Sequence, residues 1–219
     1  NPKSDWCYET QPDKGIADRS IPWPRGRVMG GSSSINGLLY VRGQPRDFDI
    51  WSQLGCAGWS WDEVLPYFKR SENWDGIDET GLRGKDGPLS VQSSRLKRDI
   101  VDHWVDAAVT AGYQRNYDYN GSTQEGVGHF QLTIRGGRRC SSSAAYITPF
   151  KSRKNLKIIT NAHTKKVNII DGRATSVDID IKNKPDKISA RREIIISAGS
   201  IGSPQILMLS GIGPGEDLK

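Results

Sequence analysis

Several features common in membrane and secreted proteins are missing from this sequence of 219 residues. No apolar run approaches the roughly 20 residues that a bilayer-spanning helix requires. The three cysteines, Cys7, Cys56 and Cys140, are far apart and form no CxxC pair, so neither a disulfide framework nor a zinc site is indicated. We interpret them as reduced thiols of a cytoplasmic protein.

The signatures of several enzyme classes are missing as well. The sequence contains no G-x-S-x-G elbow, no HExxH pair, no P-loop and no G-x-G-x-x-G dinucleotide fingerprint. The three histidines, His103, His129 and His163, lie in unrelated segments, and we expect each to have an ordinary structural role. Residue chemistry alone therefore assigns no catalytic residue and no metal ligand.

The charge balance is basic but not concentrated. The net charge is +6, from 31 lysines and arginines against 25 acidic residues, and the basic residues are mixed with acids along the chain. No basic stripe interleaved with aromatic residues is present, which argues against a nucleic-acid partner. A bound anionic cofactor accounts for the excess of cations more economically.

What the sequence does contain is a short run of small residues, Gly30-Gly31-Ser32-Ser33, with Arg27 nearby. Glycines allow backbone N–H groups to approach a phosphate closely, and hydroxyls add donors. Arg27 would neutralise a phosphate or close the loop. A tight turn rich in small residues explains the same run equally well, so residue chemistry leaves both interpretations open.

The clearest helical signals lie in the first two thirds of the chain. Ser60 and Glu63 have capping-box spacing and predict a helix to about residue 71, which Pro66 should kink or delay. Residues 96–111 predict a longer helix that ends at Gly112, because apolar positions follow helical spacing at Ile100, Trp104, Ala107, Ala108 and Ala111.

Weaker patterns complete this part of the chain. Shorter helices are expected over residues 45–51 and between Ser141 and Pro149, and strands near residues 89–92 and 129–134. The tract 116–128, rich in Asn, Gly, Asp and Tyr, is typical of an ordered loop over a pocket or an interface.

Towards the C-terminus the pattern changes to period two. The runs 155–160, 165–170 and 174–181 predict strands, the last two joined by a hairpin at Asp171-Gly172. Ile194–Ile196 predicts a strand covered on both faces, followed by a helix capped at Ser203. The expected fold class is therefore α/β, with helices and strands mixed.

Two segments together point to a family. "GRVMGGSSSINGLLYVRG" and "AGSIGSPQILMLSGIGP" resemble the two signatures of the glucose–methanol–choline (GMC) flavoprotein oxidoreductases, in the family's order. "GWSWDEVLPYFKRSEN" and "GGRRCSSSAAYITPF" resemble choline-dehydrogenase-like and alcohol-dehydrogenase-like members, so essentially the whole chain is covered. The resemblance implies a GMC-type FAD-binding fold with a partial substrate domain.

The resemblance also implies where FAD would lie. Ile35 occupies the position at which some relatives have a histidine bonded to flavin, so non-covalent FAD is expected. Positions that match family contacts lie in both signatures and in one strand between them: Gly30, Gly31, Ser32, Asn36, Gly37, Leu39, Thr164, Ala198 and Gly199. Arg27 is added to the expected cofactor-binding residues because of its charge.

By the same resemblance, residues 1–45 and 151–219 belong to a discontinuous FAD-binding domain. Residues 46–150 would form an intervening region of helices and loops and part of the substrate domain. We expect the chain to be the middle of a longer enzyme, with a G-x-G-x-x-G unit before it and the catalytic histidine after it, and to be inactive alone.

The implied function is oxidation of a small-molecule alcohol to an aldehyde or ketone by hydride transfer to flavin. The likeness to bacterial relatives favours a dehydrogenase over an oxidase. The expected location is the cytoplasm, free or peripheral to the inner membrane. The alternatives are a non-catalytic FAD-binding relative and a relative with other flavin chemistry, such as a lyase or photodecarboxylase.

Overall fold

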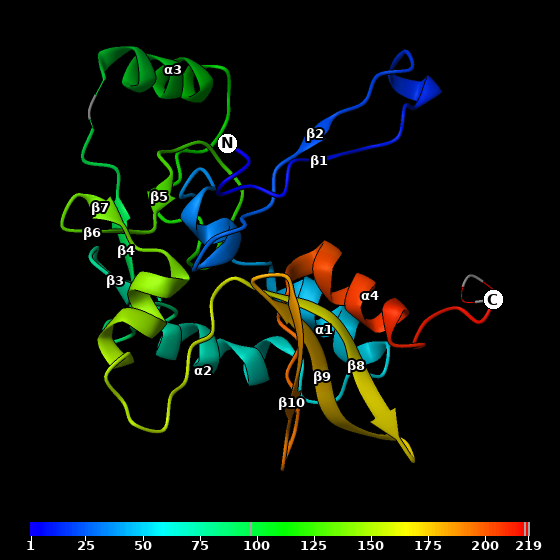
Figure 1. Ribbon diagram of the computed structural model, residues 1–219. Helices are drawn as coiled ribbons and strands as arrows, with labels where there is room; N and C mark the ends of the chain where they lie inside the picture. The colour runs from blue at the N-terminus through cyan, green and yellow to red at the C-terminus, as the bar shows by residue number, and fades with distance from the viewer. Residues whose placement is uncertain (97, 217, 219) are drawn as a thin grey trace. The chain divides into compact units, whose positions relative to one another are not determined.

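The computed structural model describes residues 1–96, 98–216 and 218, and it combines helices with short strands (Figure 1). The chain separates into two compact units, Asn1–Leu156 and Lys157–Lys219. Each unit contains both kinds of element, which confirms the expected mixed α/β class.

In the first unit, short strands alternate with helices. The elements in chain order are β1 (Tyr8–Glu9), η1 (Lys14–Ile16), β2 (Pro22–Trp23), η2 (Gly31–Ser34), α1 (Pro45–Gln53), α2 (Trp61–Ser71), β3 (Glu72–Trp74), β4 (Leu89–Ser93), α3 (Asp99–Thr110), β5 (Gln131–Leu132), β6 (Ile134–Arg135), β7 (Arg138–Arg139), η3 (Ser143–Ile147) and η4 (Thr148–Phe150). β4 pairs in parallel with β3 and antiparallel with β5. The pairs β1–β2 and β6–β7 form separate antiparallel ribbons.

Helices α1 and α2 form where the sequence predicts them. The backbone N–H and the hydroxyl of Ser60 both donate to Glu63 Oε2, at 3.0 and 2.6 Å. This contact ties the N-cap to the first turn and favours a helix start there. Pro66 lies inside α2 without delaying its start. An aromatic cluster joins the two helices, with the ring centroids of Phe48 and Phe68 separated by 5.5 Å.

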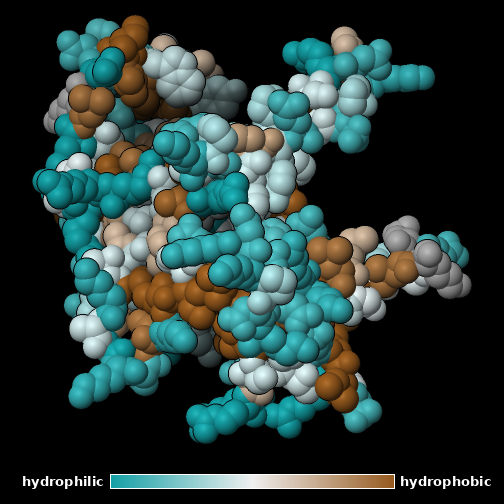
Figure 2. Space-filling view, in the orientation of Figure 1, coloured by the Kyte–Doolittle hydropathy of each residue, from teal (hydrophilic) through white to brown (hydrophobic). Residues whose placement is uncertain are grey.

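Helix α3 occupies the predicted segment but buries a different face. Val105 is 1% exposed, whereas Ile100 and Trp104 of the predicted apolar stripe are 72% and 66% exposed. Figure 2 shows apolar surface over this helix. The predicted helix is therefore present, and its apolar stripe is not the face that the described part of the first unit buries.

A buried ion network joins the strands and loops of the first unit. Glu72 is 0% exposed and accepts hydrogen bonds from Arg42 at 2.5 Å, from Arg83 at 2.6 Å and from the N–H of Gly84 at 2.8 Å. Arg83 also donates to Asp118 at 2.5 Å. Each buried charge is thus compensated by opposite charges or hydrogen bonds, as burial requires.

The second unit is an antiparallel sheet with one helix. Its elements are β8 (Ala162–Ile170), β9 (Arg173–Ile181), β10 (Lys184–Ser189) and α4 (Gly199–Leu209), with strand order β10-β9-β8. Asp171 and Gly172 have φ of 50° and 75°, the left-handed values of a tight hairpin turn. The predicted hairpin is therefore confirmed. Ser210 Oγ accepts from Val167 N at 2.8 Å and fastens the end of α4 to β8.

Three predictions for the C-terminal part are wrong. Residues 155–160 and Ile194–Ile196 form no strand, because no strand of the described chain pairs with them. Helix α4 begins at Gly199 and not after Ser203, so the following proline lies inside the helix. Ser203 Oγ instead accepts a hydrogen bond from Ala198 N at 3.0 Å, within the first turns of α4.

Candidate functional site

The glycine loop, residues 26–37, contains the predicted cofactor-binding run. Gly30 and Gly31 have φ of 88° and 53°, a region that L side chains enter only with strain. A Cβ at Gly30 would lie 2.5 Å from Ser34 Oγ, so this glycine is packed inside the loop. A Cβ at Gly31 would meet nothing within 4 Å. The backbone is therefore open at Gly31, as close approach of a ligand requires.

Gly26, which the sequence analysis did not single out, closes the loop. A Cβ there would lie 2.2 Å from the carbonyl carbon of Gly31, so only glycine allows the two backbone segments to cross. The N–H of Gly26 donates to Ser32 Oγ at 3.1 Å. Gly26 lies four residues before Gly30 in the sequence, but this spacing alone does not indicate a crossing.

The three serines of the loop have different roles. The Ser33 hydroxyl donates to the carbonyl of Gly30, and the Ser34 hydroxyl donates to the carbonyl of Met29 at 2.8 Å. These two protons hold the loop itself, although the sequence analysis treated the Ser33 hydroxyl as a donor to a ligand. Ser32 Oγ only accepts, from Gly26, among the described residues. Its side chain is exposed, and its proton remains for a ligand.

The end of the loop continues into a strand-like segment beside β5. The N–H of Thr133 donates to Leu38 O at 2.9 Å, and the N–H of Tyr40 donates to Gln131 O at 2.9 Å. Leu39 between them forms an isolated bridge with Leu132 and is 48% exposed. The predicted positions in this stretch therefore lie on an accessible edge of the first unit.

Arg139 is the residue of this site that sequence reasoning missed. Its guanidinium donates to Ser33 O at 3.1 Å and to Asn36 Oδ1 and Asn36 O at 2.7 and 2.8 Å. Ser142, three positions further on, donates to Gly30 O at 3.1 Å. The segment "GGRRCSSS" carried the family resemblance, but nothing in its pattern indicated that it contacts the glycine loop.

The remaining predicted positions are more scattered. Arg27 stacks over Trp6, with 4.8 Å from its guanidinium carbon to the ring centroid. In the second unit, Thr164 lies in β8 opposite Ile179. Ala198 is the N-cap of α4, and Gly199, with φ of 85°, is its first residue.

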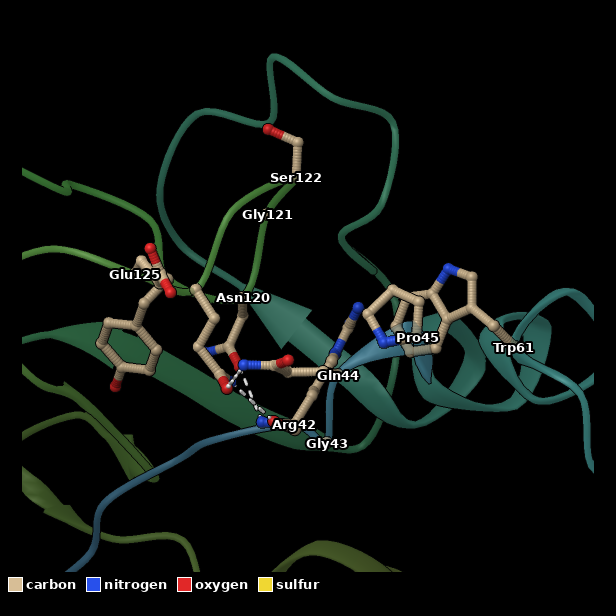
Figure 3. A pocket seen from close by; sticks show the side chains of 11 residues that line it. Arg42, Gly43, Gln44, Pro45, Trp61, Asn120, Gly121, Ser122 and Glu125 are labelled. Atoms are coloured by element: carbon tan, nitrogen blue, oxygen red, sulfur yellow. Dashed lines mark hydrogen bonds between the residues drawn. The ribbon is translucent and has the colours of Figure 1, made fainter. Parts of the chain in front are cut away.

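A polar pocket lies next to the segment that follows the glycine loop (Figure 3). It has a volume of about 250 Å³. One wall is formed by residues 42–45 and Trp61, and the other by residues 119–122, 124 and 125. The N–H of Arg42 donates to Asn120 Oδ1 at 2.7 Å across the pocket. The prediction of an ordered loop over a pocket is thus confirmed for tract 116–128.

Two half-buried tyrosines, Tyr40 and Tyr119, lie beside this wall. The hydroxyl of Tyr119 donates to Tyr40 O at 2.9 Å and accepts from Gln131 N at 2.7 Å. Burial raises the pKa of Tyr119 and, with the charge of Glu72, the pKa of Tyr40. Both phenols therefore stay neutral across the physiological range and act as hydrogen-bonding supports.

The titratable groups that the structure describes form no second site. His129 Nε2 lies 2.9 Å from Asp102 Oδ1 at the surface, and His103 lies exposed on α3. Among the described residues, no cluster of histidine, cysteine and acidic side chains is arranged to hold a metal ion. The three cysteines are free, and no described helix is long and apolar enough to cross a membrane.

Comparison with known proteins identifies relatives over nearly the whole chain. The family profile described as GMC oxidoreductase matches residues 15–218. The oxygen-dependent choline dehydrogenases of Rhizobium johnstonii and Brucella ovis are each 47% identical over 215 residues, which is 98% of this chain. The chain spans 39% of the length of these curated relatives.

Solved structures agree with this result. Pyridoxine 4-oxidase from Mesorbium loti superposes with a TM-score of 0.91 at 32% identity, over 98% of this chain and 42% of that one. An FAD-dependent oxidoreductase from Chaetomium thermophilum gives a TM-score of 0.90 at 28% identity, over 97% and 39%. These matches confirm the expected fold, the oxidoreductase class and FAD as the cofactor of that class. The chain belongs to the GMC oxidoreductase family.

Proposed function

We propose that this chain is part of an FAD-dependent enzyme that oxidises an alcohol to an aldehyde or ketone, with choline as the leading substrate. The observation that carries the proposal is 47% identity to choline dehydrogenases over 98% of the chain. The activity is proposed for the whole protein, because the chain spans 39% of those relatives. Bound FAD supplies the acceptor for the hydride that leaves the alcohol carbon.

The residues of the glycine loop fit this cofactor. The backbone at Gly31 is open, Ser32 keeps a hydroxyl proton, and Arg139 brings a positive charge to the loop. Such donors suit a diphosphate. We propose that the loop contacts the diphosphate, ribityl and flavin regions through Gly30, Gly31, Ser32, Asn36, Gly37 and Leu39.

The other predicted contacts with FAD are also part of this proposal. Arg27 would add positive charge near a phosphate. Thr164, through its main chain, and Ala198-Gly199, at the start of α4, would contact the adenosine end. Ile35 offers no atom for a covalent bond to flavin, so we propose that FAD is held non-covalently.

We also propose that residues 1–45 and 151–219 contribute to one discontinuous FAD-binding domain. Residues 46–150 would then form the intervening region and part of the substrate domain. The wall of the polar pocket at residues 119–122, 124 and 125 belongs to this intervening region.

Anaerobic titration of the purified full-length protein tests the function. We expect a yellow protein whose flavin absorbance bleaches on addition of choline, and more slowly or not at all with pyridoxine. If pyridoxine bleaches the flavin and choline does not, alcohol oxidation is supported and choline is ruled out as the substrate. A flavin spectrum that no alcohol bleaches would contradict the proposal and favour a non-catalytic relative, a lyase or a photodecarboxylase.

A further inference from the structure

Hydrogen bonds join Arg139 to the glycine loop, although the two are more than a hundred residues apart in the sequence. It lies at the end of β7, and its guanidinium donates three hydrogen bonds. Two of them end on Asn36, at the side-chain Oδ1 and the main-chain O, 2.7 and 2.8 Å away. This two-point attachment uses the planar fork of the guanidinium, which a lysine does not offer.

These bonds determine which way the Asn36 amide faces. Its Oδ1 also accepts from Leu38 N at 3.1 Å. Two donors, Arg139 and the N–H of Leu38, converge on this one atom, and only the oxygen of the amide can accept from them. The NH₂ group is therefore turned away from Arg139. Asn36 is exposed, so it presents a hydrogen-bond donor to a ligand.

The guanidinium of Arg139 lies against the glycine loop and forms no ion pair among the described residues. Its three acceptors are neutral oxygens of Ser33 and Asn36. None of the ion pairs among the residues that the structure describes includes Arg139. A half-buried cation that is not neutralised by a carboxylate favours an anionic ligand nearby.

We propose that Arg139 is a positioning residue for the cofactor: it fixes Asn36 so that the amide NH₂ faces the bound flavin nucleotide, and it adds positive charge to the loop. The proposal rests on the proposed function insofar as FAD is the ligand. It does not depend on which alcohol is oxidised, because its readout is the binding of the cofactor.

The test is a double-mutant cycle in the full-length protein, with the dissociation constant of FAD measured by flavin fluorescence on refolded or stripped enzyme. We expect Arg139→Gln to weaken FAD binding by about 10- to 100-fold, in the range of lost charge-assisted hydrogen bonds. Arg139→Lys should recover only part of this loss, because it keeps the charge and loses the fork. Arg138→Gln, at the exposed neighbouring position in β7, is the matched control and should leave binding unchanged.

The second arm separates positioning from general support of the fold. In an Asn36→Ala background, Arg139→Gln should cost much less than it costs alone, because the amide that it orients is gone. Fully additive losses would overturn the proposal, and so would equal losses for Arg138→Gln. If Arg139→Gln fails to fold, Arg139→Lys replaces it in the double-mutant cycle with Asn36→Ala, and additive losses of FAD affinity would again overturn the proposal.

The outcomes also separate this proposal from the proposed function. A protein that binds FAD with coupled Arg139 and Asn36, but whose flavin no alcohol reduces, supports the positioning role and contradicts alcohol oxidation. A protein that binds FAD with uncoupled residues contradicts only the positioning role. A wild-type protein that binds no FAD overturns both.

Discussion

The glycine loop and the β8–β9 hairpin are built by opposite means. In the loop, Arg139 bonds to Asn36 across 103 positions, and Ser142 bonds to Ser33 across 109. In the hairpin, a tight turn at Asp171-Gly172 brings together strands that are adjacent in sequence. A contact between distant segments requires the surrounding fold, whereas a hairpin requires only its turn and its alternating strands.

The two units also differ in how they hold charge. In the first unit, Glu72 and Arg83 are each 0% exposed at the side chain and pair with each other. In the second, Lys165 and Asp180 pair at the surface, with side chains 51% and 28% exposed. Loss of an ion pair should therefore change the free energy of unfolding far more in the first unit than in the second, because only the buried pair is shielded from water.

The largest expected effect comes from breaking the buried network. Glu72→Ala should lower the free energy of unfolding by about 3–5 kcal/mol, because it leaves Arg42 buried without a carboxylate and Arg83 with Asp118 alone. Asp180→Ala in the second unit is the matched control and should cost about 1 kcal/mol or less. Urea unfolding of the full-length variants measures both, and equal costs would contradict the contrast between the two units.

The next effect concerns the open backbone of the loop. Gly31→Val should lower the FAD affinity of the full-length protein about tenfold or more, because a side chain would occupy the approach to the backbone. Gly81→Val is the control, since Gly81 also has positive φ, 71°, and open space around it. It should show the same backbone strain with normal flavin content. Unchanged flavin content in Gly31→Val would show that the loop is not the cofactor cradle.

The smallest effect is expected at a site of purely local structure. The hydroxyl and the N–H of Ser60 lower the pKa of Glu63 from its ordinary 4.5. Because the pKa is lower in the folded state, this stabilisation is fully present above pH 4.5 and is lost as the pH falls through the folded pKa. Glu63→Gln should therefore lower the thermal midpoint slightly at neutral pH and leave it unchanged in strong acid. A difference that is independent of pH would contradict this assignment.

Sequence patterns predicted the elements that depend on neighbours in the chain. The capping contact between Ser60 and Glu63 gave the start of α2, and the Asp171-Gly172 turn gave the hairpin. The sequence predicted a strand at Ile194–Ile196 that the structure does not contain. A strand needs hydrogen-bonding partners on its edges, and an apolar run does not specify these partners. The spacing in α3 likewise marked an apolar stripe but could not show which face of the helix would be covered.

By itself, the sequence determined the family and pointed to the Gly30-Gly31 pair of the loop, because signatures and left-handed backbone positions are local properties of the chain. The tertiary structure alone decided that Ser33 and Ser34 hold the loop and that Arg139 orients Asn36. Those roles depend on hydrogen bonds formed in space, and the direction of a side-chain donor is fixed only when the fold brings its acceptor within reach.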